Sequence, residues 1–379
     1  MSKLAFRKRN AEQAADRLYR FYSRQLGDEI LATLNFPPSE SDQVSPLVEP
    51  QPDDDEVRER DPLAWKELPL LLEIYRRQAR AAFDNPDDSL LTVVPIVSFE
   101  GGIETLMLGG EARFVGTRLH TWGEPVKPLI EDYGDFDWQL PDEGNVWLER
   151  YLESYRFMVR QAGNDFALNW SAELLGMNLA VQLRGAERAY LDTYDDAENL
   201  RRLLDYSYDL HLYLYGRVQE IVGEYNRALY GDHPLAQYRV DLQPNQSVDA
   251  YSVCRRGVMR QFGMAQISRF MRTVGWGNLH IHQNGRHVIE EVVEIPGWRE
   301  ARFTDGGNCE MTFALRWEIR RRMKDIPIVI RCEREEFLDA MQEHELPGNT
   351  RYVLNADSLD DAKRVMDQVY AYRAPLRKG

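Results

Sequence analysis

The stretch LHIHQNGRHVIEEVVEI, residues 279 to 295, has the pattern of a β-strand, a turn and an α-helix in direct succession. Apolar and polar residues alternate in its first four positions, which is the period of a strand with two different faces. The Asn-Gly pair at 284 and 285 is typical of a turn. Because the apolar residues after it recur at helical spacing, the stretch predicts one βα unit of a parallel sheet.

The same order of elements recurs over the last hundred or so residues. Strand-like runs lie near residues 279–282, 299–303, 326–331 and 351–354, and the helical patterns after them are HVIEEVVEI, EMTFALRWEIRRRM, EEFLDAMQEH and DDAKRVMDQVYAYR. The last helix is expected to begin at Ser358, whose hydroxyl can accept the backbone amide of Asp361. No glycine-rich phosphate-binding fingerprint follows any of these strands, so a (β/α)8 barrel is favoured over a doubly wound nucleotide-binding sheet.

A proline-rich, acidic segment separates the start of the chain from the rest. Residues 36 to 62, FPPSESDQVSPLVEPQPDDDEVRERDP, contain too many prolines for a regular element of any length. The basic, amphipathic residues 1 to 25 are interpreted as an accessory helix, with a targeting or membrane-surface segment as the alternative. We therefore expect residues 1–62 to form an N-terminal helical arm and linker, and residues 63–379 to form the barrel.

Composition narrows the class of protein. The chain has 379 residues, a net charge of −15 and 29% charged residues, which is the composition of a soluble globular protein. Its negative charge would repel a phosphate backbone, so nucleic acid is not expected as a partner, and no apolar run suggests a membrane span. Its three cysteines, Cys254, Cys309 and Cys332, form no CxxC pair and are expected to be buried fillers in a reducing cytoplasm.

The histidines of the opening stretch are the main candidates for chemistry. In a strand, Leu279 and Ile281 share one face while His280 and His282 share the other. If the apolar pair faces the outer helices, both imidazoles point into the mouth of the barrel, where barrel enzymes keep their active sites. The two interpretations are metal ligation or substrate binding, and ordinary strand histidines that bond to polar neighbours.

A carboxylate near the first strand-like run is a second candidate. Glu100 follows the apolar run LLTVVPIVSF and precedes a Gly-Gly turn and the helical pattern IETLMLG. It can therefore reach the barrel mouth as a general base, a partner of a cation or a metal ligand. The alternative is an ordinary carboxylate in a turn.

Taken together, these segments resemble the uroporphyrinogen decarboxylase superfamily of (β/α)8 barrels. GNLHIHQNGRHVIEEVVEIPGW is similar to the strand, loop and helix that carry its His-x-Cys-Gly or His-x-Asp-Gly motif, and Glu100 stands nine positions before Gly109, as in the early strand of that superfamily. Val248-Asp249-Ala250 resembles its Phe-Asp-Ser segment, and TRYVLNADSLDDAKRVM resembles its eighth strand and last helix. The resemblance implies that Asp249 and Asp357 also lie at the mouth.

Departures from the superfamily pattern separate its two branches. The Arg-Gln-Ala-Gly-Arg motif with which the decarboxylases grip substrate carboxylates is missing before residue 84, and the loop after the eighth strand lacks their histidine. The corrinoid-dependent methyltransferases, which exchange methyl groups with cobalamin-type cofactors on partner proteins, hold zinc with the His-x-Cys pair and a later cysteine. The resemblance then implies zinc or another divalent metal on His280, His282 and Asp357, a ligand set able to bind such ions.

The leading expectation is a methyltransferase of a corrinoid-dependent system that acts on a small methylated substrate, with Glu100, Asp249, His280 and His282 as catalytic residues. Asn284 and Arg286 flank the turn and are candidates for binding a cofactor carboxylate, although solvated side chains would look the same. Two alternatives stay open: a decarboxylase of uroporphyrinogen or a smaller acid, and a non-catalytic tetrapyrrole- or corrinoid-binding protein. The oligomeric state, including a homodimer, also stays open.

Overall fold

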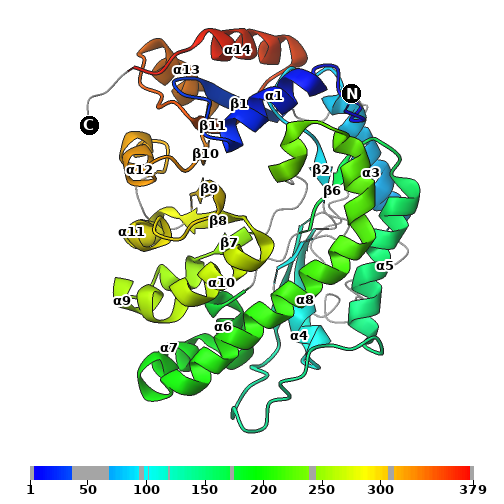
Figure 1. Ribbon diagram of the computed structural model, residues 1–379, viewed down its shortest axis with the longest axis vertical. Coiled ribbons are helices and arrows are strands. Elements are labelled where there is room, and N and C mark those ends of the chain that lie inside the picture. Colours follow the sequence, from blue (N-terminus) through cyan, green and yellow to red (C-terminus); the bar gives the residue numbers. More distant parts are fainter. Residues whose placement is uncertain are drawn as a thin grey trace.

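The computed structural model describes residues 4–35, 68–93, 98–100, 102–117, 120–170, 175–238, 245–305 and 311–375. These residues form an α/β fold in which helices surround the strands on the outside (Figure 1). The proline-rich segment 36–62 lies outside the described residues, as does the predicted domain boundary at residue 62.

The largest sheet has six strands in the order β1-β11-β10-β9-β8-β7, and all neighbouring strands in it are parallel. Its strands are β1 (Ile30–Asn35), β11 (Thr350–Asn355), β10 (Ile328–Arg331), β9 (Trp298–Thr304), β8 (Gly277–His282) and β7 (Asn245–Ser247). The four strand-like runs expected in the last hundred residues are β8 to β11. Parallel neighbours place the carboxyl ends of all six strands at one edge of the sheet.

Helices follow these strands in the expected alternation. They are α11 (Ile289–Val292), α12 (Arg316–Arg322), α13 (Arg334–Gln342) and α14 (Leu359–Ala371), while α10 (Met264–Val274) precedes β8. Figure 1 shows them along the outer side of the sheet. The predicted start of α14 is confirmed, since the Ser358 hydroxyl accepts a hydrogen bond from the Asp361 amide at 3.2 Å.

The remaining described strands form two smaller sheets. β2 (Thr92–Val93) pairs with β6 (Ala167–Leu168), and β5 (His120–Pro125) lies between β3 (Ser98–Glu100) and β4 (Ala112–Thr117). The β4–β5 pair is antiparallel, which a regular βα repeat does not predict. The described residues therefore show a parallel α/β arrangement of the kind found in barrels, but they do not show a closed ring of eight strands.

Further helices, from the six-residue α4 to α8 with 34 residues, pack around this half of the fold. They are α3 (Leu68–Ala82), α4 (Gly102–Met107), α5 (Val146–Gln161), α6 (Met177–Arg184), α7 (Ala186–Asp195) and α8 (Ala197–Tyr230). The predicted helix at IETLMLG is α4. Among the helices of the described residues, none combines the length and the apolar character needed to cross a membrane.

The first 35 residues contribute to the main sheet as well as to a helix. α1 (Ala11–Tyr22) is the expected N-terminal helix, but it is followed by β1, which pairs residue by residue with β11. Leu31 and Leu34 of β1 are buried, so burial of their side chains accompanies the backbone pairing. Residues 30–35 therefore belong to the main sheet, although they precede residue 62.

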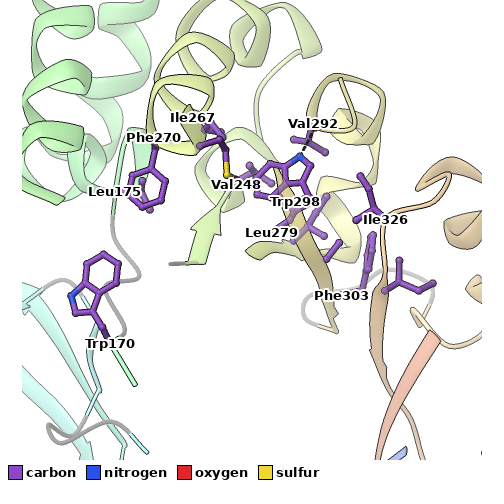
Figure 2. Packing of buried hydrophobic residues seen from close by; sticks show 14 of the residues in the cluster. Trp170, Leu175, Val248, Ile267, Phe270, Leu279, Val292, Trp298, Phe303 and Ile326 are labelled. Atoms are coloured by element: carbon purple, nitrogen blue, oxygen red, sulfur yellow. Dashed lines mark hydrogen bonds between the residues drawn. The ribbon is translucent and has the colours of Figure 1, made fainter. Parts of the chain in front are cut away.

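The core between sheet and helices sets the direction of the β8 side chains. Leu279 and Ile281 are fully buried, and Figure 2 shows Leu279 among apolar side chains that include Val248 and Trp298. The Trp298 indole nitrogen donates a hydrogen bond to the Val292 carbonyl at 2.7 Å, which ties β9 to α11. Because the apolar residues of β8 face this core, His280 and His282 face the other side of the sheet.

Candidate functional site

Three side chains from two neighbouring segments meet on the inner face of the sheet. His280 and His282 come from the carboxyl half of β8, and Asp249 comes from the 3-10 turn Asp249–Tyr251 directly after β7. β7 and β8 pair in parallel with Ser247 opposite His280, so the end of β7 delivers Asp249 beside the histidines. All three side chains are about one-third exposed, which leaves them reachable from solvent.

The distances within this cluster match those between metal ligands. His280 Nε2 lies 3.2 Å from His282 Nε2 and 3.4 Å from Asp249 Oδ2, and His282 Nε2 lies 3.6 Å from the same oxygen. Bonds of about 2.0–2.1 Å to a tetrahedral zinc ion separate two ligand atoms by about 3.3 Å. The three donors therefore fit zinc or a similar divalent ion with little movement. A hydrogen-bonded imidazole pair beside a carboxylate fits the same distances.

Asp249 is held in place by its neighbours. Its Oδ2 accepts a hydrogen bond from the Ser247 hydroxyl at 2.8 Å, while its Oδ1 is buried and has no hydrogen-bond partner among the described residues. Burial acts to raise the pKa of Asp249, but the hydrogen bond and charge of His280 and the charge of His282 outweigh it and hold the pKa below its usual value. The carboxylate is thus ionised at neutral pH, and its Oδ2 is the oxygen that faces both imidazoles.

A cavity of about 350 Å³ lies farther along the same sheet. It is lined by residues of α1, β1, β2, β9, β10 and β11 and of the segment before β2, including Arg302, Arg331 and Arg351. Arg302 lies opposite His280 in the parallel β8–β9 pair, and Thr304, which also lines the cavity, lies opposite His282. Adjacent strands are about 5 Å apart, so the cavity adjoins the cluster.

A buried carboxylate beneath this cavity positions two of its arginines. Glu300 is fully buried; its Oε1 accepts from Arg302 Nε at 2.5 Å, and its Oε2 accepts from Arg351 at 2.8 Å and from the Tyr22 hydroxyl at 3.1 Å. Burial by itself would raise the pKa of Glu300, but the charges of Arg302, Arg351 and Arg299 lower it to about 2. Glu300 is therefore charged at neutral pH.

The other predicted site residues lie away from the cluster, or their side chains are not described. Asp357 is 81% exposed and lies 4.0 Å from Arg334, while its backbone amide donates to Asp361. Asn284 is exposed and donates to the Ser252 hydroxyl at 3.3 Å. Arg286 is half-buried in the turn Gln283–Val288. Glu100 ends β3, and its side chain lies outside the described part of the structure.

The structure does not bring Asp357 to the histidines because the end of β11 leads directly into the cap of α14. Asp249 occupies the position near the imidazoles that the resemblance gave to Asp357. The cysteines also stay apart: burial raises the pKa of the Cys254 and Cys332 thiols, which disfavours thiolates, and Cys309 lies outside the described residues. Among the described residues, the candidate cation ligands are therefore two imidazoles and one carboxylate.

The cavity arginines were not singled out from the sequence, although a signal for them exists. In β9, Glu300, Arg302 and Thr304 stand at alternate positions, as His280 and His282 do in β8. Reading the strand near 299–303 with the same period-two rule would have placed them on the inner face. They went unpredicted because arginine is usually a surface residue, so the residue type alone does not mark a site.

The fold is similar to that of a known enzyme structure. A methyltransferase from Methanosarcina mazei matches with a TM-score of 0.56 and 13% sequence identity, over 94% of this chain and 98% of that chain. At this identity the likeness shows a shared fold and does not carry the activity across. The sequence matches no protein-family model, and no curated protein shows significant similarity to it. Membership of the superfamily named above stays a prediction.

Proposed function

We propose that this protein is a methyltransferase of a corrinoid-dependent methyl-transfer system and acts on a small methylated substrate. The observation that carries the proposal is the convergence of Asp249, His280 and His282 on the inner face of the sheet, at the carboxyl ends of the strands. Active sites of parallel α/β barrels lie at that end. The fold shared with the Methanosarcina mazei methyltransferase supports the proposal.

In this proposal the three side chains hold zinc or another divalent ion. When bound, the ion supplies Lewis-acid activation of an oxygen- or nitrogen-bearing substrate. His280 and His282 contribute neutral Nε2 donors, whose separation of 3.2 Å is set by their alternate positions on one strand. Asp249 contributes a negative charge, and Ser247 fixes the orientation of that carboxylate.

The methyl group would pass between this substrate and the cobalt of a corrinoid supplied by a partner protein. The exposed third of each cluster side chain leaves a path from the cluster to solvent, which such a partner needs. Cys254 and Cys332 are half-buried, and burial raises the pKa of both thiols, so neither is suited to carry the methyl group itself. The acceptor or donor must therefore be brought to the site.

The test combines metal analysis with a methyl-transfer assay. Purified wild-type protein is analysed for zinc, and methylcobalamin or cob(I)alamin with methylated amines, methanol and thiols is followed by visible absorbance. We expect about one metal ion per chain, its loss in the His280→Ala/His282→Ala double variant, and loss of turnover in His280→Ala with folding retained by circular dichroism. Metal-free wild-type protein, together with full activity in His280→Ala, would refute the proposal.

A second candidate function is decarboxylation of a carboxylated substrate, and the cavity arginines favour it. A decarboxylase must surround substrate carboxylates with cations, and Arg302, Arg331 and Arg351 lie together beside the cluster. Incubation with uroporphyrinogen, followed by chromatography of the products, distinguishes the two functions. Decarboxylated porphyrinogens that form without added metal or corrinoid would favour this candidate over methyl transfer.

A further inference from the structure

We propose that the cavity beside the histidine–aspartate cluster binds an anionic group of the substrate, a carboxylate or a phosphate, through Arg302, Arg331 and Arg351. This inference rests on the proposed function, which states the reaction that the substrate undergoes. It adds the chemical class of that substrate: a small organic anion. The cavity volume of about 350 Å³ is near the lower end of the sites that hold small molecules, roughly 300–1,000 Å³.

Positive charge is in excess around this cavity. Three guanidinium groups line it, whereas Glu300 is the carboxylate that pairs with two of them. The nearby acids of the segment before β2 are already neutralised, since Lys8 pairs with Asp87 and Arg17 pairs with Asp88. Among the described residues, the cavity therefore carries more positive than negative charge, although the chain as a whole has a net charge of −15, and this favours an anion.

Donors in the cavity are left without partners in the described structure. Arg331 is exposed to the cavity and has no hydrogen bond or ion pair with any described residue. Arg351 is 92% buried, and its Nε has no partner among the described residues either. Buried donors usually have partners, because leaving one unpaired costs about 1–3 kcal/mol. An anion in the cavity would provide acceptors for both side chains.

Glu300 holds two of the cavity arginines in place. Its two oxygens hold Arg302 Nε and one Arg351 terminal nitrogen, while the Tyr22 hydroxyl bonds to it from α1. These contacts fix the two guanidinium groups and leave other N–H groups of Arg302 unpaired among the described residues. A guanidinium fixed in this way binds a carboxylate or phosphate with less loss of side-chain entropy.

The register of the strands places the anion site next to the cluster. Arg302 lies opposite His280 and Thr304 lies opposite His282, on the same inner face. Arg331 lies one strand farther, since the β9–β10 pair places Ile330 opposite Phe303. A small substrate can therefore be held by its anionic end in the cavity while its other end reaches the cluster.

The test measures anion binding by isothermal titration calorimetry with three probes: succinate, inorganic phosphate and the neutral analogue succinamide. We expect wild-type protein to bind succinate or phosphate but not succinamide, with affinity that falls as salt is added. The anion that binds more tightly shows whether the cavity takes a carboxylate or a phosphate. Arg331→Gln should weaken binding roughly tenfold or more, because it removes charge-assisted hydrogen bonds. Arg331→Lys should restore part of it.

Two controls separate this inference from the proposed function. Arg272→Gln, on the exposed side of α10, removes the same charge outside the cavity and should leave anion binding unchanged. The His280→Ala variant should still bind the anion, whether or not it still binds metal. Wild-type protein that binds none of the probes at millimolar concentration overturns the inference, as does equal binding by Arg331→Gln and Arg272→Gln. If the protein binds metal but none of the anions, this inference is overturned while the proposed function still holds.

Discussion

His280 and Arg302 lie directly opposite each other on the parallel strands β8 and β9, with both side chains on the inner face of the sheet. This single register position joins the histidine–aspartate cluster to the arginine-lined cavity. A one-residue slip between the two strands would turn one of the side chains toward the helices. The buried Leu279 and Phe303 on the opposite face resist such a slip, because it would expose them.

Replacement of Asp249 by Asn should weaken metal binding. The change removes the charged donor of the cluster while keeping its size, so zinc affinity should fall by at least about tenfold. Asp357→Asn is the matched control, because Asp357 is the ligand that the resemblance implies and the structure places it away from the histidines. Competition with a zinc chromophore measures both affinities. A larger loss in Asp357→Asn would contradict the arrangement of the cluster.

Replacement of Glu300 by Gln should destabilise the fold. The variant leaves Arg302 and Arg351 without their buried counter-charge, which costs about 3–5 kcal/mol at neutral pH. Urea denaturation at pH 7 measures the loss. Glu294→Gln, at an exposed position, is the control and should change stability by less than about 0.5 kcal/mol.

The same carboxylate predicts part of the acid sensitivity of the protein. Because the pKa of Glu300 is lowered to about 2 in the folded state, its stabilising effect is complete above its ordinary pKa and is lost as the pH falls from about 4.5 toward 2. That loss amounts to roughly 3 kcal/mol in wild type. The gap in unfolding free energy between wild type and Glu300→Gln should therefore narrow below pH 4.5; a constant gap would argue against an ionised Glu300.

His211 on α8 should make a separate contribution to acid unfolding. Its ring is buried against Trp170 and Phe270, and burial lowers its pKa to about 3. The unfolded chain takes up this proton near pH 6.5 and the folded chain does not, so stability falls between about pH 6.5 and 3 by on the order of 4 kcal/mol. His211→Leu should show a shallower decline over that window in urea titrations. An unchanged slope would contradict a neutral buried ring.

Replacement of two glycines by alanine should change the stability of the protein in opposite directions. A Cβ at Gly348 would lie 2.7 Å from the Gly27 carbonyl oxygen and 2.9 Å from the Asp28 Cα, and these backbone atoms cannot move aside cheaply. Gly348→Ala should destabilise the protein by about 1–3 kcal/mol. Gly216 in α8 has open space, so Gly216→Ala should stabilise it by about 0.5–1 kcal/mol. Thermal unfolding of both variants checks the pair.

The sequence was most informative where local pattern and burial agree. β8 is recognisable because Leu279 and Ile281 alternate with His280 and His282, and the structure buries the apolar pair as that pattern requires. Ser358 is recognisable as a helix cap because the interaction spans only three residues. In both cases the physical cause lies within a few positions of the residue itself.

Features that depend on distant parts of the chain were harder to predict. β1 went unrecognised because its six residues stand between a helix and a proline-rich segment, while its partner β11 is near the other end. The network of Tyr22, Glu300 and Arg351 joins α1, β9 and β11, and no local sequence pattern predicts it. Asp357 is a different case: the resemblance implied that it lies at the mouth, whereas in the structure its backbone amide bonds to Asp361 at the start of α14.

The pairing of β1 with β11 also affects how the chain folds while it is being synthesised. Ile30 leaves the ribosome about 320 residues before its partner Thr350, a delay of roughly 15–60 s at common rates of synthesis. During that interval one edge of β1 has no companion strand, and exposed strand edges invite aggregation. Newly made chains should therefore depend on chaperones until translation is nearly complete.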